Sequence, residues 1–129
     1  MGALVVITTV GTEEQANEIA RELVCRRHAG CVNVVPGLKS FYRWQGKVCR
    51  DSEFLLVIKT QQEEYPAVEA KIRELHSYEV PEILALEASR GEPSFLAWLA
   101  AALDKSQGTC EDADDELEEP LVSLDETNY

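Results

Sequence analysis

The feature that most constrains the fold is a pair of long extended segments joined by a tight turn. Residues 31–44 form the first arm, Gln45-Gly46 is a turn signal, and residues 47–60 return with the apolar stretch Phe54-Leu55-Leu56-Val57-Ile58. Each arm has 14 residues. At about 3.3 Å per residue an arm spans roughly 46 Å, whereas a compact unit of about 105 residues is only roughly 33 Å across. The tip of this hairpin should therefore extend beyond its own domain.

The tip of the predicted hairpin is aromatic. Tyr42 and Trp44 are two positions apart and so share one face of the strand. An exposed strand edge that carries large aromatic side chains favours contact with another chain. The alternative is a hairpin that bends back onto its own core. Of the two, we expect an oligomer.

Apolar periodicity and turn signals define the other elements. Their order is β-α-β-β-α-β-α. The first six elements match the ferredoxin-like βαββαβ arrangement, an α+β fold in which two helices cover one face of an antiparallel sheet. The third helix is a C-terminal addition. The expected elements are a buried central strand at 3–10, a helix from 13 to about 25, the hairpin, a helix marked by Tyr65, Val68, Ile72 and Leu75, a strand at 83–88, and a helix after Gly91-Glu92-Pro93.

Three local signals refine this prediction. Thr12-Glu13-Glu14-Gln15 is a capping-box pattern, in which the Thr12 hydroxyl accepts from the Gln15 amide and the Gln15 side chain reaches back. Gly30 is expected to close the first helix in a left-handed turn. Pro36-Gly37 should interrupt the strand ladder with a bulge.

The negative charge is concentrated at the C-terminal end. The formal net charge is −12, but residues 1–107 hold 15 acidic and 12 basic residues, a net charge of −3. Residues 108–129 hold nine acidic residues and no basic one, with few apolar residues. We therefore divide the chain into a domain at 1–107 and an acidic, disordered tail at 108–129, which could bind a protein partner. Neither part suits nucleic acid or an anionic membrane surface.

The cysteines and the N-terminus indicate a cytoplasmic protein. Cys25, Cys31, Cys49 and Cys110 show no Cys-x-x-Cys spacing, so we expect all four to be reduced. No basic segment precedes the first apolar run, and no run approaches the roughly 20 apolar residues of a membrane span.

Many functions share this fold, so the side chains must decide among them. The third strand lacks the aromatic pattern of an RNA-recognition domain, and the loop after the first strand, Thr8–Thr12, lacks the thiols of a soft-metal chaperone. That loop also lacks the arginine that an acylphosphatase needs. No nucleophile and base are paired by a sequence signature, so we predict that the chain is not an enzyme.

The remaining candidates are polar and aromatic residues of the hairpin and of the loop at 76–82. His76, Glu79 and Glu82 follow at intervals of three, and imidazole with carboxylates suits Cu(II) or zinc. In the alternative, His76 caps the preceding helix and the glutamates are solvated. The ligand cleft would be completed by Tyr42, Trp44, Glu53, Lys59 and Tyr78.

Several separated blocks resemble the CutA family of divalent-cation tolerance proteins. The resemblance covers residues 3–105. It rests on Ala29-Gly30-Cys31-Val32-Asn33-Val34-Val35-Pro36-Gly37, Ser40-Phe41-Tyr42-Arg43-Trp44-Gln45-Gly46, Glu53, Lys59-Thr60, His76-Ser77-Tyr78-Glu79-Val80-Pro81-Glu82-Ile83, and Gly91 before Phe95-Leu96-Ala97-Trp98.

This resemblance implies a ferredoxin-like subunit in a homotrimer, similar in topology to the PII signal proteins but without their long loop between strands two and three. It implies a role in tolerance to copper and other divalent cations, no established enzymatic activity, and a ligand cleft between subunits. Some members carry a cysteine where this chain has Thr8 or Thr9, and a second histidine where it has Leu75. His76 is then the one nitrogen donor of the family type.

A rival interpretation makes the trimer a scaffold. Related animal proteins have been linked to the sorting of membrane-anchored enzymes. In this interpretation the aromatic and acidic residues serve only the interface between subunits, and the acidic tail holds a protein partner.

Overall fold

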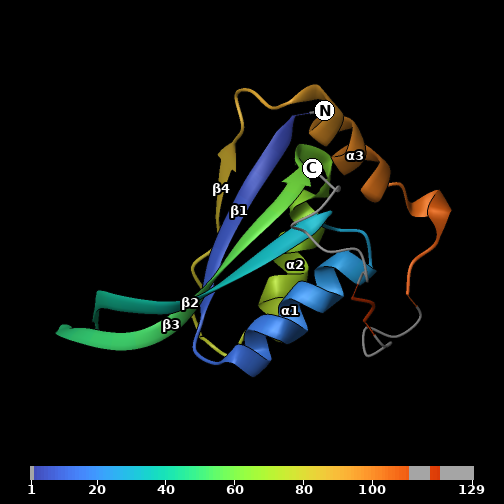
Figure 1. Cartoon of the computed structure of the whole chain (residues 1–129). Coiled ribbons are helices and arrows are strands. Elements are labelled where there is room, and N and C mark those ends of the chain that lie inside the picture. The colour runs from blue at the N-terminus through green and yellow to red at the C-terminus, as the bar shows by residue number, and fades with distance from the viewer. Residues whose placement is uncertain (1, 111–116, 120–129) are drawn as a thin grey trace.

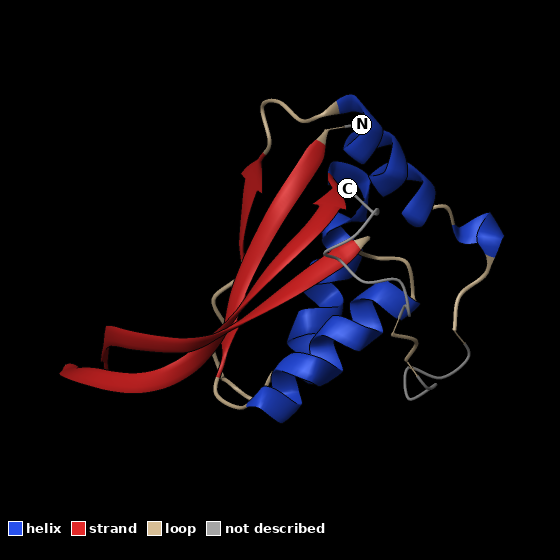
Figure 2. Cartoon of the chain, viewed as in Figure 1, coloured by secondary structure: helices blue, strands red, loops and turns tan. Residues whose placement is uncertain are grey.

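The computed structural model describes residues 2–110 and 117–119. The chain forms a four-stranded antiparallel sheet in the order β2-β3-β1-β4, with helices α1 and α2 packed on one face (Figures 1 and 2). The ferredoxin-like fold is confirmed, and α3 is the added C-terminal helix. The elements are β1 (Ala3–Val10), α1 (Glu13–Cys25), β2 (Cys31–Trp44), β3 (Lys47–Gln61), α2 (Tyr65–Leu75), β4 (Leu84–Glu87) and α3 (Pro93–Ala102), with short 3-10 turns at Gln62–Glu64 and Lys105–Gln107.

The core lies between the sheet and the two helices. Alternate residues of β1 face the helices, as the period of a strand requires, and Ile19 and Leu23 of α1 meet them at helical spacing. Val68 and Ile72 of α2 complete the layer. On the strands, the fully buried or nearly buried positions are Leu4, Val6, Thr8, Val10, Leu56, Ile58 and Thr60.

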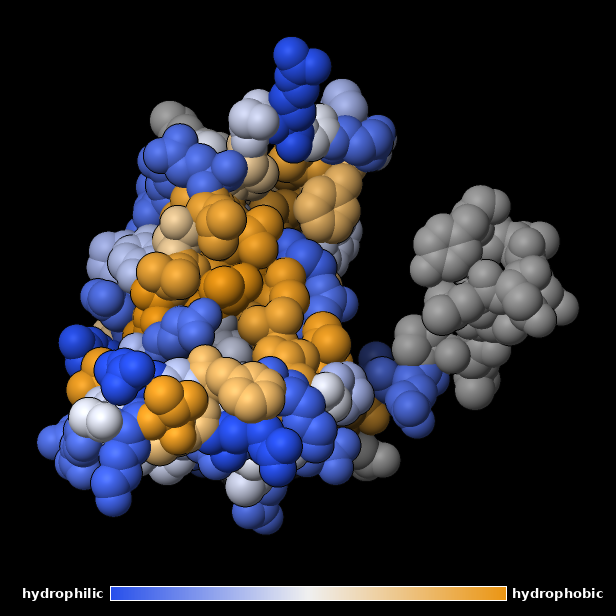
Figure 3. Space-filling model, turned by 90° about the vertical axis from the view of Figure 1, so that its left-hand side faces the viewer, coloured by the Kyte–Doolittle hydropathy of each residue, from blue (hydrophilic) through white to orange (hydrophobic). Residues whose placement is uncertain are grey.

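No helix covers the other face of the sheet in the described part of the chain. Here the expectation that β1 is buried on both faces is only half right, since Val5 and Ile7 remain partly accessible. Leu86 lies opposite Val5 and Leu84 opposite Ile7, so these side chains share one face, and Leu84 and Leu86 are 57% and 54% exposed. Leu55 and Val57 of β3 continue the same face. Figure 3 shows a broad apolar area on this side of the molecule. We call Val5, Ile7, Leu55, Val57, Leu84 and Leu86 the open apolar face.

The hairpin extends beyond the body of the domain, as predicted (Figure 1). The ladder between β2 and β3 shifts register between Val35 and Leu38, which confirms the bulge at Pro36-Gly37, and Gly37 has a φ of 84°. Gln45 and Gly46 turn the chain with φ values of 52° and 78°. Positive φ at both central residues matches the twist of a two-residue hairpin turn.

The start and the end of α1 differ in part from the prediction. The Thr12 hydroxyl accepts from the Gln15 amide at 3.1 Å, so one half of the capping box is confirmed. The Gln15 side chain does not reach back. Its amide donates to the carbonyl of Leu75 at 3.1 Å and its oxygen accepts from the Ser77 hydroxyl, which ties α1 to the end of α2. At the other end the left-handed residue is Arg27, with φ of 60°, instead of Gly30.

The chain around Cys110 is fixed to the end of α1. A disulfide joins Cys25 to Cys110, and the Cys110 amide donates to the Cys25 carbonyl at 3.2 Å. Arg27 donates to the carbonyls of Ala102 and Gly108. The expectation that all four cysteines are reduced is therefore wrong for Cys25 and Cys110, because chain tracing around α3 brings them together over 85 positions of sequence. Cys31 and Cys49 are free.

This attachment bears on the predicted tail. Cys110 is hydrogen-bonded to the last residue of α1. Most of the nine acidic residues of the tail are at positions 111–116 and 120–129, outside the described residues. The predicted disorder of the tail falls on these same positions. The boundary at 107/108 stays a prediction. None of the helices described is long and apolar enough to cross a membrane.

Gly30 allows α3 to approach the sheet closely. A Cβ at this position would lie 2.6 Å from Leu99 Cδ1 and 3.3 Å from the Cβ of Ala102. Gly30→Ala should therefore lower the free energy of unfolding by about 1–3 kcal/mol through overpacking. Chemical denaturation measures this, and adding Leu99→Ala should remove the clash with the new methyl group. Equal stability of Gly30→Ala and wild type would contradict the close approach.

Breaking the disulfide should destabilise the chain. Cys110→Ser removes a cross-link over a long loop, for which a loss of about 2–4 kcal/mol is typical. Denaturation of wild type with and without a dithiol reductant gives the comparison, and the reductant should have little effect on Cys110→Ser. A reductant-independent wild type would show that the cross-link does not form.

Candidate ligand-binding site

The candidate site is a pocket of about 750 Å³ beside the hairpin. One wall is the hairpin near its tip, and the other is the loop that connects α2 to β4. Six of the eight residues predicted from the sequence line it, whereas Lys59 and His76 do not. The lining residues are Thr9, Ser40, Phe41, Tyr42, Trp44, Asp51, Glu53, Tyr78, Glu79, Val80, Pro81 and Glu82.

A tyrosine-carboxylate hydrogen bond joins the two walls. The Tyr78 hydroxyl donates to Glu53 Oε2 at 2.7 Å, and Glu53 is only 7% exposed. Burial, followed by the hydrogen bond to Glu53 and the charge of Glu53, raises the pKa of the Tyr78 phenol well above its usual value. A carboxylate that is nearly buried needs such a donor. This bond therefore holds the 76–82 loop against β3.

A second pair of the same kind lies nearer the tip of the hairpin. The Tyr42 hydroxyl donates to Asp51 Oδ2, and this bond, more than any other cause, raises the pKa of Tyr42 to about 12. Both phenols thus keep their protons at neutral pH, and both carboxylates act as acceptors.

His76 lies behind the pocket and positions the loop. Its Nε2 is 2.7 Å from the carbonyl oxygen of Thr9, and its Nδ1 accepts from the Tyr78 amide at 3.0 Å. Because a carbonyl only accepts, Nε2 carries the proton. The ring also contacts the Tyr78 ring, with centroids 4.6 Å apart. The cap of α2 comes from the backbone instead of the imidazole, since the His76 amide donates to the Ile72 carbonyl at 2.8 Å.

The predicted metal ligands are not gathered into one cluster. Glu79 and Glu82 line the pocket, but both ring nitrogens of His76 are already engaged. Within the described part of the chain, no three His, Cys, Asp or Glu side chains lie together so that they could hold a metal ion. The donors of one subunit therefore do not fit a metal centre, and the set of His76, Glu79 and Glu82 stays a prediction.

Lys59 lies elsewhere on the sheet. Its ammonium group donates to Asn33 Oδ1 and is 4.0 Å from the Cys31 sulfur. Since Cys31 is directly opposite Lys59 in the ladder, the three residues form a separate polar contact near the base of the hairpin.

Six residues of the lining were not among the predicted site residues, namely Thr9, Ser40, Phe41, Asp51, Val80 and Pro81. Asp51 could have been predicted from the sequence, because residues 49, 51 and 53 share a strand face and Tyr42 pairs with Cys49. Thr9 could not, because its place beside the hairpin depends on the pairing of β1 with β3.

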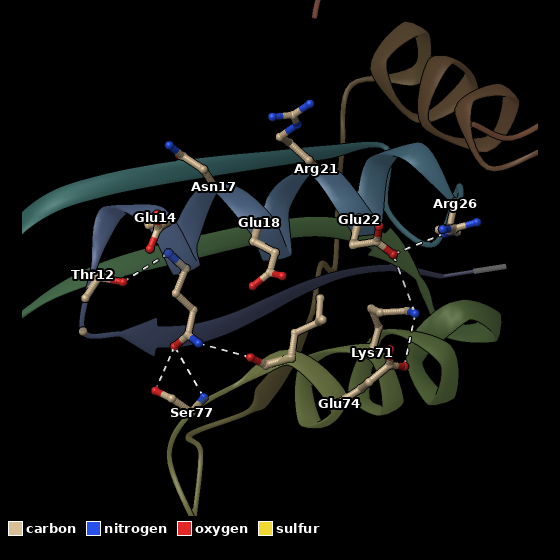
Figure 4. Close-up of a pocket in the computed structure, with 13 residues that line it drawn as sticks. Thr12, Glu14, Asn17, Glu18, Arg21, Glu22, Arg26, Lys71, Glu74 and Ser77 are labelled. Atoms are coloured by element: carbon tan, nitrogen blue, oxygen red, sulfur yellow. Dashed lines mark hydrogen bonds and ion pairs between the residues drawn. The ribbon is translucent and has the colours of Figure 1, made fainter. Parts of the chain in front are cut away.

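A larger hollow of about 950 Å³ lies between α1 and α2 (Figure 4). Its charged residues compensate one another. Lys71 is 3.7 Å from Glu22 and 3.2 Å from Glu74, and Arg26 is 3.2 Å from Glu22. Charges of both signs line this hollow and several of them are paired, so the hairpin pocket is the better candidate.

The hairpin pocket, in contrast, has charge of one sign only. Asp51, Glu53, Glu79 and Glu82 line it, and no lysine, arginine or histidine does. Carboxylates gathered in one concave site raise the local concentration of cations. The site is therefore suited to a cationic ligand.

Comparison with known proteins places the sequence in a family named for tolerance to divalent ions. The sequence model of the CutA1 divalent ion tolerance protein family matches residues 4–102. The chain is 50% identical over 95 residues to the divalent-cation tolerance protein CutA of Thermus thermophilus, covering 74% of this chain and 92% of that protein. It is 45% identical over 91 residues to the mouse protein CutA, covering 70% of this chain and 51% of the relative.

A solved structure of a divalent cation tolerance protein from Thermus thermophilus superposes with a TM-score of 0.74 at 48% identity, covering 75% of this chain and 94% of that one. The fold is α+β, and its hairpin pocket is lined by four carboxylates and by no basic residue. The chain belongs to the CutA1 divalent ion tolerance family. It spans nearly all of the Thermus relative but about half the length of the mouse protein.

The Tyr78–Glu53 pair makes a prediction for alkaline titration. Its raised phenol pKa contributes stability that is fully present below the ordinary tyrosine pKa of about 10 and is lost as pH rises through the raised value. Glu53→Gln removes the anionic acceptor, so the pKa of Tyr78 should fall toward its ordinary value, as measured by tyrosinate absorbance. Asp51→Asn is the matched control and should shift Tyr42 instead. Identical titration curves for wild type and Glu53→Gln would contradict the pairing.

Proposed function

We propose that the chain forms a homotrimer of PII-like architecture that handles divalent cations, copper among them, at a cleft between subunits, without catalysing a reaction. The observation that carries this proposal is the position of the acidic pocket. It lies between the overhanging hairpin and the 76–82 loop, on the same side of the sheet as the open apolar face. A neighbouring subunit on that face would close the pocket.

The apolar face supports assembly. Burying apolar surface stabilises an interface by about 25 cal/mol per Å², and this face carries aliphatic side chains on three adjacent strands. The tip of the hairpin, with Tyr42 and Trp44, would extend along the next subunit. Both features are typical of a surface that a second copy covers.

Metal binding in this proposal depends on more than one subunit. Glu79 and Glu82 supply carboxylate oxygens on one wall, and the open side of the pocket leaves room for donors of a neighbouring subunit. Carboxylates suit hard or borderline divalent ions, with Cu(II) or zinc favoured over Cu(I) in the absence of a thiol.

A scaffold remains the second candidate. The engaged nitrogens of His76 favour it, because a histidine that positions a loop is not available as a ligand. In this alternative the assembly holds a protein partner, with the acidic tail as the contact. We also propose a cytoplasmic location. Fractionation of the source cells tests this, since the chain should be found in the cytosolic fraction.

Assembly is tested by placing a charge on the open apolar face. Leu86→Lys should weaken subunit association by at least about tenfold, because a buried leucine contact is lost and a charge must be desolvated. Sedimentation equilibrium gives the mass, which for wild type should be three times the chain mass of 14.4 kDa. Val24→Lys is the control, since Val24 is 42% exposed on α1, away from this face. A monomeric wild type would end the trimer proposal.

Metal binding is tested by calorimetry with Cu(II) and zinc at neutral pH. The double variant Glu79→Gln/Glu82→Gln should lose most of the binding, because neutral amides are poorer ligands. His76→Ala tests the histidine separately. Unchanged binding in that variant would remove His76 from the ligand set, and no binding by wild type would leave the scaffold as the better account.

A further inference from the structure

The hairpin pocket is lined by aromatic rings and by carboxylates, and both favour a cationic ligand. Phe41, Tyr42, Trp44 and Tyr78 contribute aromatic rings, and the other polar residues of the lining are mainly carboxylates. Aromatic faces attract cations through the ring quadrupole, and the attraction is strongest where water is excluded. An aromatic lining with carboxylates is the combination that recognises an ammonium group.

The negative charge of the pocket is not neutralised by the described residues of the chain that forms it. None of its carboxylates forms an ion pair with any residue that the structure describes. Glu53 is more than nine-tenths buried, and the bond from the neutral Tyr78 phenol satisfies one of its oxygens without cancelling its charge. A buried carboxylate is costly unless a cation compensates it. The ligand would supply that cation.

Thr9 adds a polar group to the same cavity. It is only 9% exposed and it lines the pocket. Its hydroxyl can donate to or accept from a ligand there.

The same lining does not resemble a metal centre. A metal ion requires several donor atoms converging within about 2.0–2.6 Å of one point, and the described residues offer no such cluster of three. Both phenol hydroxyls are already donating to carboxylates. The volume of about 750 Å³ suits a small organic molecule more than a bare ion.

We propose that the hairpin pocket binds an organic cation, an ammonium group carried on a small apolar body, with Glu53 and the rings of Trp44 and Tyr78 facing the ammonium group. This inference rests on the proposed function in one respect, namely that the pocket is the cation site of the assembly. The organic cation and a divalent ion are then alternative ligands of the same acidic pocket.

The test uses the full chain and matched probes. Choline and n-butylammonium are the cationic probes, and 3,3-dimethyl-1-butanol is the neutral isostere of choline. Calorimetry should show at least one ammonium probe binding about tenfold or more tightly than the isostere. Equal binding of choline, n-butylammonium and the neutral alcohol, or no binding of any probe, would overturn the proposal.

Variants locate the binding. Glu53→Gln should weaken binding of the preferred probe by at least about tenfold, and Trp44→Leu should weaken it by a smaller factor of about three to ten. Glu14→Gln, in the hollow between α1 and α2, is the control and should bind as wild type does. Tyr78→Phe keeps the ring and should retain most of the affinity if the fold is intact. Undiminished binding in Glu53→Gln would overturn the assignment to this pocket.

The outcome separates this inference from the proposed function. Sedimentation and a Cu(II) titration are run on the same samples. A trimer that binds Cu(II) but no ammonium probe would overturn the organic ligand and keep the proposed function. Ammonium binding without Cu(II) binding would support the organic ligand and remove the metal role.

Discussion

The pairing of β2 with β3 beyond the edge of the helices determines most of what is particular to this molecule. Along the first part of the ladder the hairpin belongs to the sheet and contributes Leu56 and Ile58 to the core. After the bulge at Pro36-Gly37, the same two strands continue without helices to cover them (Figure 1). The side chains of this extension can therefore contact only solvent, one another, or a second chain. Its aromatic and acidic composition makes it a wall for a binding site.

The site also depends on the loop after α2. A loop with Pro81 would otherwise be held by few contacts, but His76 bridges the Thr9 carbonyl and the Tyr78 amide, and Tyr78 in turn reaches Glu53. These bonds connect β1, the loop and β3 in one chain of contacts. The pocket is thus supported by backbone geometry on one side and by a buried carboxylate on the other. In this arrangement His76 shapes the cavity, and Glu53 sets its charge.

Much of this could be predicted from the sequence, for identifiable reasons. Strand and helix periods gave the element order, Gln45-Gly46 gave the turn, and the length of the arms gave the overhang. Local rules could not place contacts between distant segments. The side chain of Gln15 bonds to Leu75 and Ser77 instead of to its own helix start. The Cys25–Cys110 disulfide joins two segments that are 85 positions apart and that no local spacing relates. Six residues that the sequence grouped by their strand and loop positions line one pocket, namely Tyr42, Trp44, Glu53, Tyr78, Glu79 and Glu82. Lys59 lies outside this pocket, and Thr9 was missed because its place depends on the pairing of β1 with β3.

The central claim is that the open apolar face and the overhanging hairpin are covered by other copies of the chain in solution. Amide hydrogen exchange tests it most directly, because β4 and the tip of the hairpin are edge elements with little protection of their own in a single subunit. The account predicts that amides of Leu84–Glu87 and of residues 38–53 exchange as slowly as those of the buried strand β1. Exchange at both segments as fast as in the loop at 88–92 would contradict it.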